Sequence, residues 1–299
     1  MSVVIPFVRE MDFAYGEVQQ VSPLIRRVIA KNPSPFTFHG TGVYIIGKGE
    51  VAMIDPGPDM PEWQDALMRA LGGDKLTHIF LTHAHLDHSP AAAPLARATG
   101  AMVYANPAPT KSGKAEVLMD AEADSGFAFD IGLKDGDVLH GPGWSIEAIF
   151  TPGHTSNHVS YALHEENACF TGDHIMGWST TVVTPPDGDM AAYLDSLTKI
   201  RKRGFTTLWP THGPPIREPA PFIDAYRAHR LAREDQILTQ VRAGHTQIKD
   251  MIGAMYADVD PRLHPAAAQS VLAHAIRLVG AGVLKTDGAP DMQSNYRIA

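Results

Sequence analysis

The residues best suited to chemistry form one dense cluster, Thr-His-Ala-His-Leu-Asp-His at positions 82–88. Four candidate metal ligands, His83, His85, Asp87 and His88, lie within six residues, directly after an apolar run. Alternate side chains of a strand point to opposite faces, so a tight loop leaving the strand, and not the strand, must direct them at one point. Imidazoles with a carboxylate suit zinc and also bind iron or manganese.

Three further candidate ligands repeat this context. His154 lies in TPGHT (151–155) after WSIEAIF, Asp173 lies in TGD (171–173) after ACF, and His212 lies in PTHGP (210–214) after TTLW. Each follows a predicted strand, and Gly or Pro supplies a sharp turn. Four strand ends that present ligands on one edge of a sheet predict a single pocket.

Seven ligands are too many for one tetrahedral ion, so we predict two divalent cations, with zinc favoured and iron or manganese as alternatives. We assign them as follows: His83, His85 and His154 on one ion, Asp87, His88 and His212 on the other, and Asp173 bridging. Room for a shared water marks a catalytic site, whereas structural zinc sites are closed and usually hold cysteines. The chain has a single cysteine, Cys169.

The expected reaction is hydrolysis by a metal-bridging hydroxide, because two cations lower the pKa of a shared water from about 16 toward about 7. Asp87 is the candidate catalytic residue that orients this hydroxide or accepts its proton. His158, Thr180 and Thr181 are the candidate substrate-binding residues, although packing for His158 and local turn hydrogen bonds for the threonines fit as well. Asp55, at the end of IDPG, is expected to brace the ligand loop by hydrogen bonds.

The elements that must position these residues are short apolar runs alternating with helical stretches over about residues 36–216. Strands are predicted at 42–47, 50–55, 78–83, 144–150, 158–163, 168–172 and 206–210, and helices at 61–71, 89–100 and 190–204. This mixture predicts an α/β (α+β) fold of sheets covered by helices. Residues 105–130 show little regular pattern and predict a long loop near the site.

After residue 225 the pattern becomes helical, which predicts a domain of residues 1–225 and a second one of residues 226–299. Three helices, the first closed by Gly244 and the others at 246–258 and 264–282, precede a small hairpin. This order suggests a winged-helix-like unit. Its third helix offers Arg277 as the only permanent cation, so specific DNA recognition is disfavoured, and packing against the main body or a second copy of the chain fits better.

Composition and charge narrow the function classes. Residues 1–225 carry 16 Lys/Arg against 26 Asp/Glu, whereas residues 226–299 carry 9 against 7. An acidic main body argues against tight nonspecific binding of nucleic acid. The amino terminus lacks a basic start, no stretch reaches the roughly 20 apolar residues of a membrane helix, and one cysteine cannot close an intrachain disulfide. We therefore expect a cytoplasmic protein without membrane partners.

The metal motifs, in the order THAHLDH, TPGHT, TGD and PTHGP, together with VAMIDPG (51–57), resemble those of the metallo-β-lactamase superfamily. AHRLAREDQIL (228–238) and the helical tail resemble the branch that includes beta-lactamase-like protein 2. The resemblance implies an αββα sandwich with the ions at one edge. The commonest β-lactam hydrolases use a cysteine where this chain has Asp173, so antibiotic hydrolysis is not expected. Oxygen-reducing relatives carry a carboxylate at the position of His85.

The sequence leaves the substrate class open. One hypothesis is acyl chemistry on a thioester, ester or lactone, as in many members of the superfamily. A second is cleavage of single-stranded RNA, which the beta-lactamase-like protein 2 branch implies and the acidic body weakens. A third is a non-catalytic scaffold, which the intact ligand set disfavours. A fourth is a non-heme iron sulfur dioxygenase, because such relatives keep the same first motif.

Overall fold

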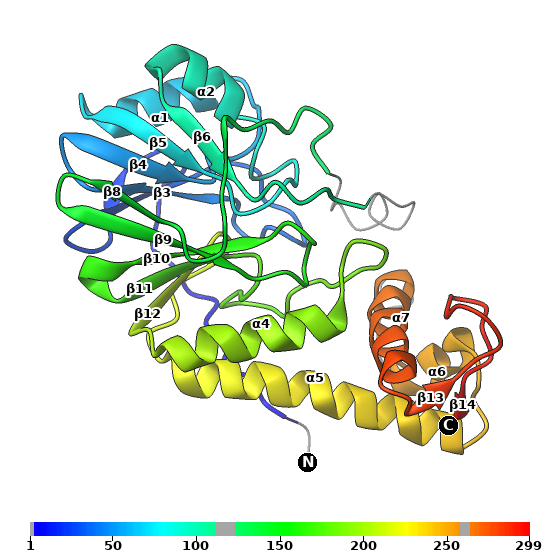
Figure 1. Cartoon of the computed structure of the whole chain (residues 1–299). Helices are drawn as coiled ribbons and strands as arrows, with labels where there is room; N and C mark the ends of the chain where they lie inside the picture. Colours follow the sequence, from blue (N-terminus) through cyan, green and yellow to red (C-terminus); the bar gives the residue numbers. More distant parts are fainter. Residues whose placement is uncertain (1–2, 112–122, 258–263) are drawn as a thin grey trace.

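The structure, a computed structural model, describes residues 3–111, 123–257 and 264–299. Two β-sheets face each other, and helices cover the outer face of each sheet (Figure 1). The predicted αββα arrangement is confirmed. Residues 112–122, within the loop predicted at 105–130, and Asp258, the last residue of a predicted helix, lie outside the described residues.

In the described ranges, the first sheet contains seven strands in sequence order. They are β1 (Gln19–Gln20), β2 (Ile25–Ile29), β3 (Gly42–Ile46), β4 (Glu50–Ile54), β5 (Lys75–Phe80), β6 (Met102–Ala105) and β7 (Ile131–Gly132). Strands β1 to β4 pair antiparallel, whereas β4 to β7 pair parallel. The parallel connections carry helices α1 (Trp63–Leu71) and α2 (Ala92–Thr99), as crossovers between parallel strands require.

The second sheet has the order β12-β11-β10-β9-β8. Its strands are β8 (Val138–Gly141), β9 (Trp144–Phe150), β10 (Val159–Leu163), β11 (Ala168–Gly172) and β12 (Thr207–Pro210), with the short 3-10 helix η1 (His164–Glu166) between β10 and β11. Helix α4 (Met190–Arg203) connects β11 to β12, which pair parallel. Asp189 begins this helix by accepting hydrogen bonds from the backbone N of Ala191 and Ala192.

Three apolar layers result from the alternation of side chains along the strands. In β3, Val43 and Ile45 pack toward α1 and α2. The alternate residues, Tyr44 and Ile46, pack toward the second sheet. The outer face of the second sheet packs on α4 and on the first half of α5 (Pro219–Arg242). Cys169 is fully buried in this outer layer.

The carboxy-terminal unit has a separate core. Helices α6 (Ile248–Met255) and α7 (His264–Gly280) pack on the second half of α5, and the hairpin of β13 (Leu284–Lys285) and β14 (Arg297–Ile298) completes it (Figure 1). The domain boundary predicted at residue 225 lies inside α5, which passes through it without interruption. None of the helices in the described ranges combines the length and apolar character that a membrane crossing requires.

Candidate metal centre

The predicted ligands lie in loops at one edge of the two sheets. Strands β4 and β5 run parallel in the first sheet, and β9, β11 and β12 share one direction in the second. Loops that follow these strands therefore emerge at a common edge. The loop after β5 carries the 82–88 motif, and the loops after β9, β11 and β12 carry His154, Asp173 and His212.

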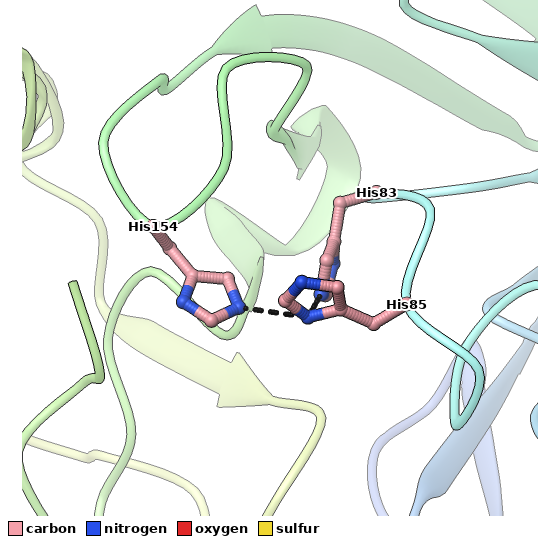
Figure 2. Close-up of side chains that lie close together, drawn as sticks. All are labelled: His83, His85 and His154. Carbon is pink, nitrogen blue, oxygen red and sulfur yellow. Dashed lines mark hydrogen bonds between the residues drawn. The ribbon is translucent and has the colours of Figure 1, made fainter. Parts of the chain in front are cut away.

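One group of ligand atoms consists of the imidazoles of His83, His85 and His154 (Figure 2). His83 Nε2 lies 2.9 Å from His85 Nδ1, which lies 3.2 Å from His154 Nε2. All three side chains are buried. These residues come from two loops about 70 positions apart, and their converging nitrogens are the group predicted for the first ion.

A second group contains Asp87, His88 and His212. Asp87 Oδ2 lies 3.0 Å from His212 Nε2 and 3.4 Å from His88 Nε2. Asp173 lies between the two groups: Oδ1 is 3.6 Å from His88 Nε2 and 3.3 Å from His212 Nε2, while Oδ2 is 3.8 Å from His154 Nε2. A carboxylate whose two oxygens face opposite groups has the placement expected of a bridging ligand.

The chemistry of these atoms fits cations. Within the described part of the chain, His88 Nε2, His212 Nε2 and Asp173 Oδ1 are buried and have no hydrogen-bond partner, although they lie close to one another. Buried polar atoms without partners are rare and costly, and three of them close together fit a bound cation. The ligand atoms within each group lie within 4.8 Å of one another. These His and Asp groups could hold a dinuclear metal site.

Hydrogen bonds to the second ring nitrogen fix how the imidazoles are oriented. His154 Nδ1 donates to Val182 O at 2.6 Å, and His212 Nδ1 donates to Gly40 O at 3.2 Å. A carbonyl oxygen can only accept, so the proton resides on Nδ1 and the lone pair on Nε2 faces the site. This is the tautomer that a metal ligand needs.

Asp55, the residue directly after β4, braces the loop as predicted. Its carboxylate is fully buried and accepts from Thr82 N at 2.8 Å, from Thr82 Oγ1 at 2.7 Å and from His88 Nδ1 at 2.8 Å. Thr211 Oγ1 donates from the β12 loop at 3.2 Å. One carboxylate therefore joins two of the ligand loops and orients His88.

The surroundings shift the pKa values of the site histidines in opposite directions. Burial, together with the neighbouring imidazoles, lowers the pKa of His83 and lowers that of His85 to about 3. These rings are neutral near pH 7 and able to bind a cation. Burial also opposes the charged form of His88, but the carboxylates of Asp87, Asp173 and Asp55 outweigh it and raise the pKa of His88 well above its ordinary value.

The predicted substrate-binding residues differ in where they lie relative to the cavity. His158 does not face the cavity: it is fully buried beneath the site, its Nδ1 lies 2.9 Å from Thr151 Oγ1, and its Nε2 accepts from the backbone N of Asp173 at 3.3 Å. The predicted substrate contact of His158 is therefore wrong for this geometry, and the residue supports the Asp173 loop instead. His174 is also fully buried and packs its ring against Tyr193.

Thr180 and Thr181 both line the cavity at the ligand cluster, but they differ in exposure. Thr181 is buried, and its hydroxyl donates to the carbonyl oxygens of Asp173 at 2.8 Å and His174 at 3.0 Å. This is the local turn hydrogen bonding considered as the alternative. Thr180 is partly exposed, and its contact with substrate stays a prediction.

The cavity has a volume of about 380 Å³ and connects the ligand cluster to the carboxy-terminal unit. Its walls are mostly apolar, and they include Met176, Trp178, Val183, Ala267 and Tyr256. Trp178 stacks on Phe38 with ring centroids 4.7 Å apart. Helices α5 and α7 contribute walls that no motif near the ligands predicts.

Arg230, in α5, is a cavity residue that the sequence reasoning missed. A signal for it exists in the helix pattern. Phe222, Tyr226, Arg230, Glu234 and Ile237 recur every three or four residues and are all buried. A cation on the buried stripe of a helix is unusual, because charged residues are rarely buried without a partner or a function.

Comparison with known proteins assigns the chain to a family. The family model described as "Metallo-beta-lactamase superfamily" matches residues 37–212, more than half of the sequence. The chain belongs to the metallo-β-lactamase superfamily. A second model, described as "Beta-lactamase associated winged helix domain", matches residues 248–289 and confirms the predicted winged-helix-like unit of this superfamily member.

Individual relatives in the superfamily agree. The chain is 31% identical to the beta-lactamase-like protein 2 homolog of Caenorhabditis elegans over 274 residues, 90% of this chain and 88% of the relative. It is 30% identical to an atrochrysone carboxyl ACP thioesterase of Cryptosporiopsis sp. (strain 8999) over 240 residues, 79% and 69% of the two chains. A beta-lactamase domain protein from Burkholderia ambifaria shares the fold, with a TM-score of 0.77, 18% identity and coverage of 97% and 96%. The chain is accordingly a hydrolase of the metallo-β-lactamase superfamily.

Proposed function

We propose that the protein is an acyl hydrolase that cleaves a thioester, ester or lactone and uses two zinc ions held by the predicted ligands. The observation that carries this proposal is that the ligand cluster lies in the wall of a largely apolar cavity. An apolar cavity of this volume suits the hydrocarbon part of an acyl group. The similarity to a protein named a thioesterase supports the same chemistry.

Five imidazoles and two carboxylates supply only nitrogen and oxygen donors, a set that zinc binds and that iron and manganese also accept. When bound, the cations supply Lewis acidity to a carbonyl oxygen and make a water acidic enough to yield hydroxide near neutral pH. The protein residues do the remaining work. His83, His88 and His154 keep fixed orientations through buried packing and hydrogen bonds, so little rearrangement is needed during turnover.

Asp87 is the residue to which we assign the orientation of the attacking water. Its side chain is 22% exposed, compared with 12% for Asp173, and it lines the cavity wall beside His212. The contacts with His88 and His212 outweigh the effect of burial and hold the pKa of Asp87 well below its ordinary value. The carboxylate is therefore ionised, so it can accept a hydrogen bond from the attacking water and orient it.

The cavity walls favour an acyl substrate over single-stranded RNA. RNA binding relies on several cations along the backbone and on exposed aromatic faces for the bases. Among the described cavity residues, Arg230 is the only permanent cation. Cleavage of RNA and sulfur dioxygenase activity are therefore the alternatives that an assay of substrate class must test.

The test loads the full chain with zinc, measures bound metal by elemental analysis, and offers one preparation a set of thioesters, esters and lactones. We expect close to two ions per chain and release of thiol from thioesters that stops after complete chelation. Labelled single-stranded RNA and an oxygen electrode run in parallel. An RNA ladder without thiol release, or oxygen uptake without hydrolysis, would contradict the acyl proposal, as would full activity of the chelated protein.

A further inference from the structure

The wall of the cavity contains a buried guanidinium. Arg230 is 4% exposed, and it lines the same cavity as the ligand residues His85, Asp87 and His154. It is fixed in place: Nη2 donates to Thr181 O, and the guanidinium carbon lies 5.2 Å from the centre of the Tyr193 ring. Arg230 therefore occupies a defined position in the cavity wall.

This guanidinium has spare donors and no acidic partner. Of its five N–H groups, one forms a hydrogen bond within the described parts of the chain, and Nε is buried without a partner. No carboxylate lies within 4.0 Å of it in residues 3–111, 123–257 and 264–299. Glu234, one turn further along α5, is already occupied by Arg277 at 2.5 Å and His274 at 3.2 Å.

A buried cation without a counter-ion is costly, and proteins retain such groups where a ligand supplies the opposite charge. The planar fork of a guanidinium matches a carboxylate, which accepts two parallel N–H bonds. The cavity walls also include apolar side chains, with Met176, Val183 and Ala267 among them. One cavity thus brings together the candidate metal ligands, apolar wall residues and a guanidinium without an acidic partner among the described residues.

We propose that Arg230 binds a carboxylate carried by the acyl part of the substrate, so that the preferred substrate is a thioester or ester of a dicarboxylic acid. This inference rests on the proposed acyl hydrolase function and narrows its substrate class. Arg230 is a specificity residue in this assignment, since it contacts the distal anionic group and not the reacting carbonyl. A single guanidinium suits one carboxylate better than the several phosphates of a nucleotide or RNA chain.

The first experiment compares substrates that differ only in the distal group. The zinc-loaded full chain hydrolyses N-acetylcysteamine thioesters in two matched pairs, adipoyl with hexanoyl and succinyl with butanoyl. We expect kcat/KM to favour one dicarboxylic member on the order of 10- to 100-fold over its neutral partner, the range that a charge-assisted hydrogen bond supports. In Arg230→Met the ratio falls to near one, and Arg230→Lys retains part of it.

Arg242→Met is the matched control, because Arg242 lies on the same helix, is exposed and is not among the residues that line the cavity. Its ratio is expected to match that of the unmodified chain. If kcat/KM of the unmodified chain is nearly equal for the dicarboxylic and the neutral member in both pairs, the proposal is overturned. An equal fall for both members of a pair in Arg230→Met also overturns it, because this would show that Arg230 only holds the backbone of Thr181.

Binding without turnover separates this proposal from the proposed function. Calorimetry with adipate, hexanoate and inorganic phosphate on the zinc-loaded protein and on Arg230→Lys needs no hydrolysis. Tighter binding of adipate than of hexanoate, weakened in the variant, supports the anion site even if no thioester is cleaved. Equal binding of adipate and hexanoate overturns the proposal, and phosphate binding that exceeds adipate binding and weakens more than it in Arg230→Lys overturns the choice of a carboxylate.

Discussion

Replacement of Asp55 by asparagine is expected to weaken metal binding, although the two side chains have nearly the same size and shape. The amide oxygen can keep the hydrogen bond from Thr82 N, but the amide nitrogen then faces Thr82 Oγ1, Thr211 Oγ1 and His88 Nδ1. The two hydroxyls can rotate and accept. The imidazole can accept at Nδ1 only by moving its proton to Nε2, the atom that faces Asp87 and Asp173.

The magnitude follows from the contacts that change. Removal of a group that orients a metal ligand typically weakens metal binding by about 10- to 100-fold, which is about 1.4 to 2.7 kcal/mol. In the metal-free protein, Asp55→Asn replaces one charge-assisted bond to His88, so we expect a loss of about 2 kcal/mol of unfolding free energy. Asp55→Ala leaves four donors without an acceptor and is expected to cost about 4 kcal/mol.

The assay is competition for zinc with a chelator of known affinity, combined with urea unfolding of the metal-free protein. Asp135→Asn serves as the control, because this exposed carboxylate pairs with Lys199 at the surface, away from the ligands. We expect the control to bind zinc as the unmodified chain does. Unchanged zinc affinity in a folded Asp55→Asn variant would refute the role given to Asp55 in orienting His88.

Three further outcomes are expected. His85→Ala removes the nitrogen shared by the first group, so elemental analysis should show fewer than two ions per chain and turnover should be lost; full occupancy would contradict the ligand assignment. Gly153→Ala places a Cβ 2.4 Å from backbone of α4 at a φ of 144°, and is expected to cost about 2 kcal/mol or more in urea unfolding, against about 1 kcal/mol for Gly204→Ala, which meets no atom within 4 Å. Hydrogen bonds from Arg203 at 2.7 and 2.5 Å lower the pKa of Glu147 from 4.5 to about 2, so the pair stabilises the fold above pH 4.5 and this contribution disappears as the pH falls toward 2. Because the pair is partly exposed, Arg203→Ala is expected to cost at most about 1 kcal/mol at pH 7, and a gap to the unmodified chain that stays constant down to pH 2.5 would contradict the assignment.

The sequence predicted the strands that carry ligands because their signals are local. An apolar run of four to seven residues followed by Gly or Pro describes both a buried strand and its sharp end, as in TPGHT at residues 151–155. Strand β6 carries this signal but was not predicted, whereas three other strands that were missed lack it. Arg26 and Arg27 interrupt β2, and β1 and β7 contain two residues each, so pairing with neighbouring strands, and not their own pattern, defines them.

The sequence by itself determined which side chains could bind metal, since ligand type and position after a strand are properties of short segments. Only the tertiary structure decided which side chains line the cavity. It placed His158 beneath Asp173 and not in the cavity, and it brought Arg230 from a helix that begins beyond the last ligand into the cavity wall. The physical reason is that a cavity is made by the packing of α5 and α7 against the sandwich, and long-range packing leaves only a faint trace in local spacing.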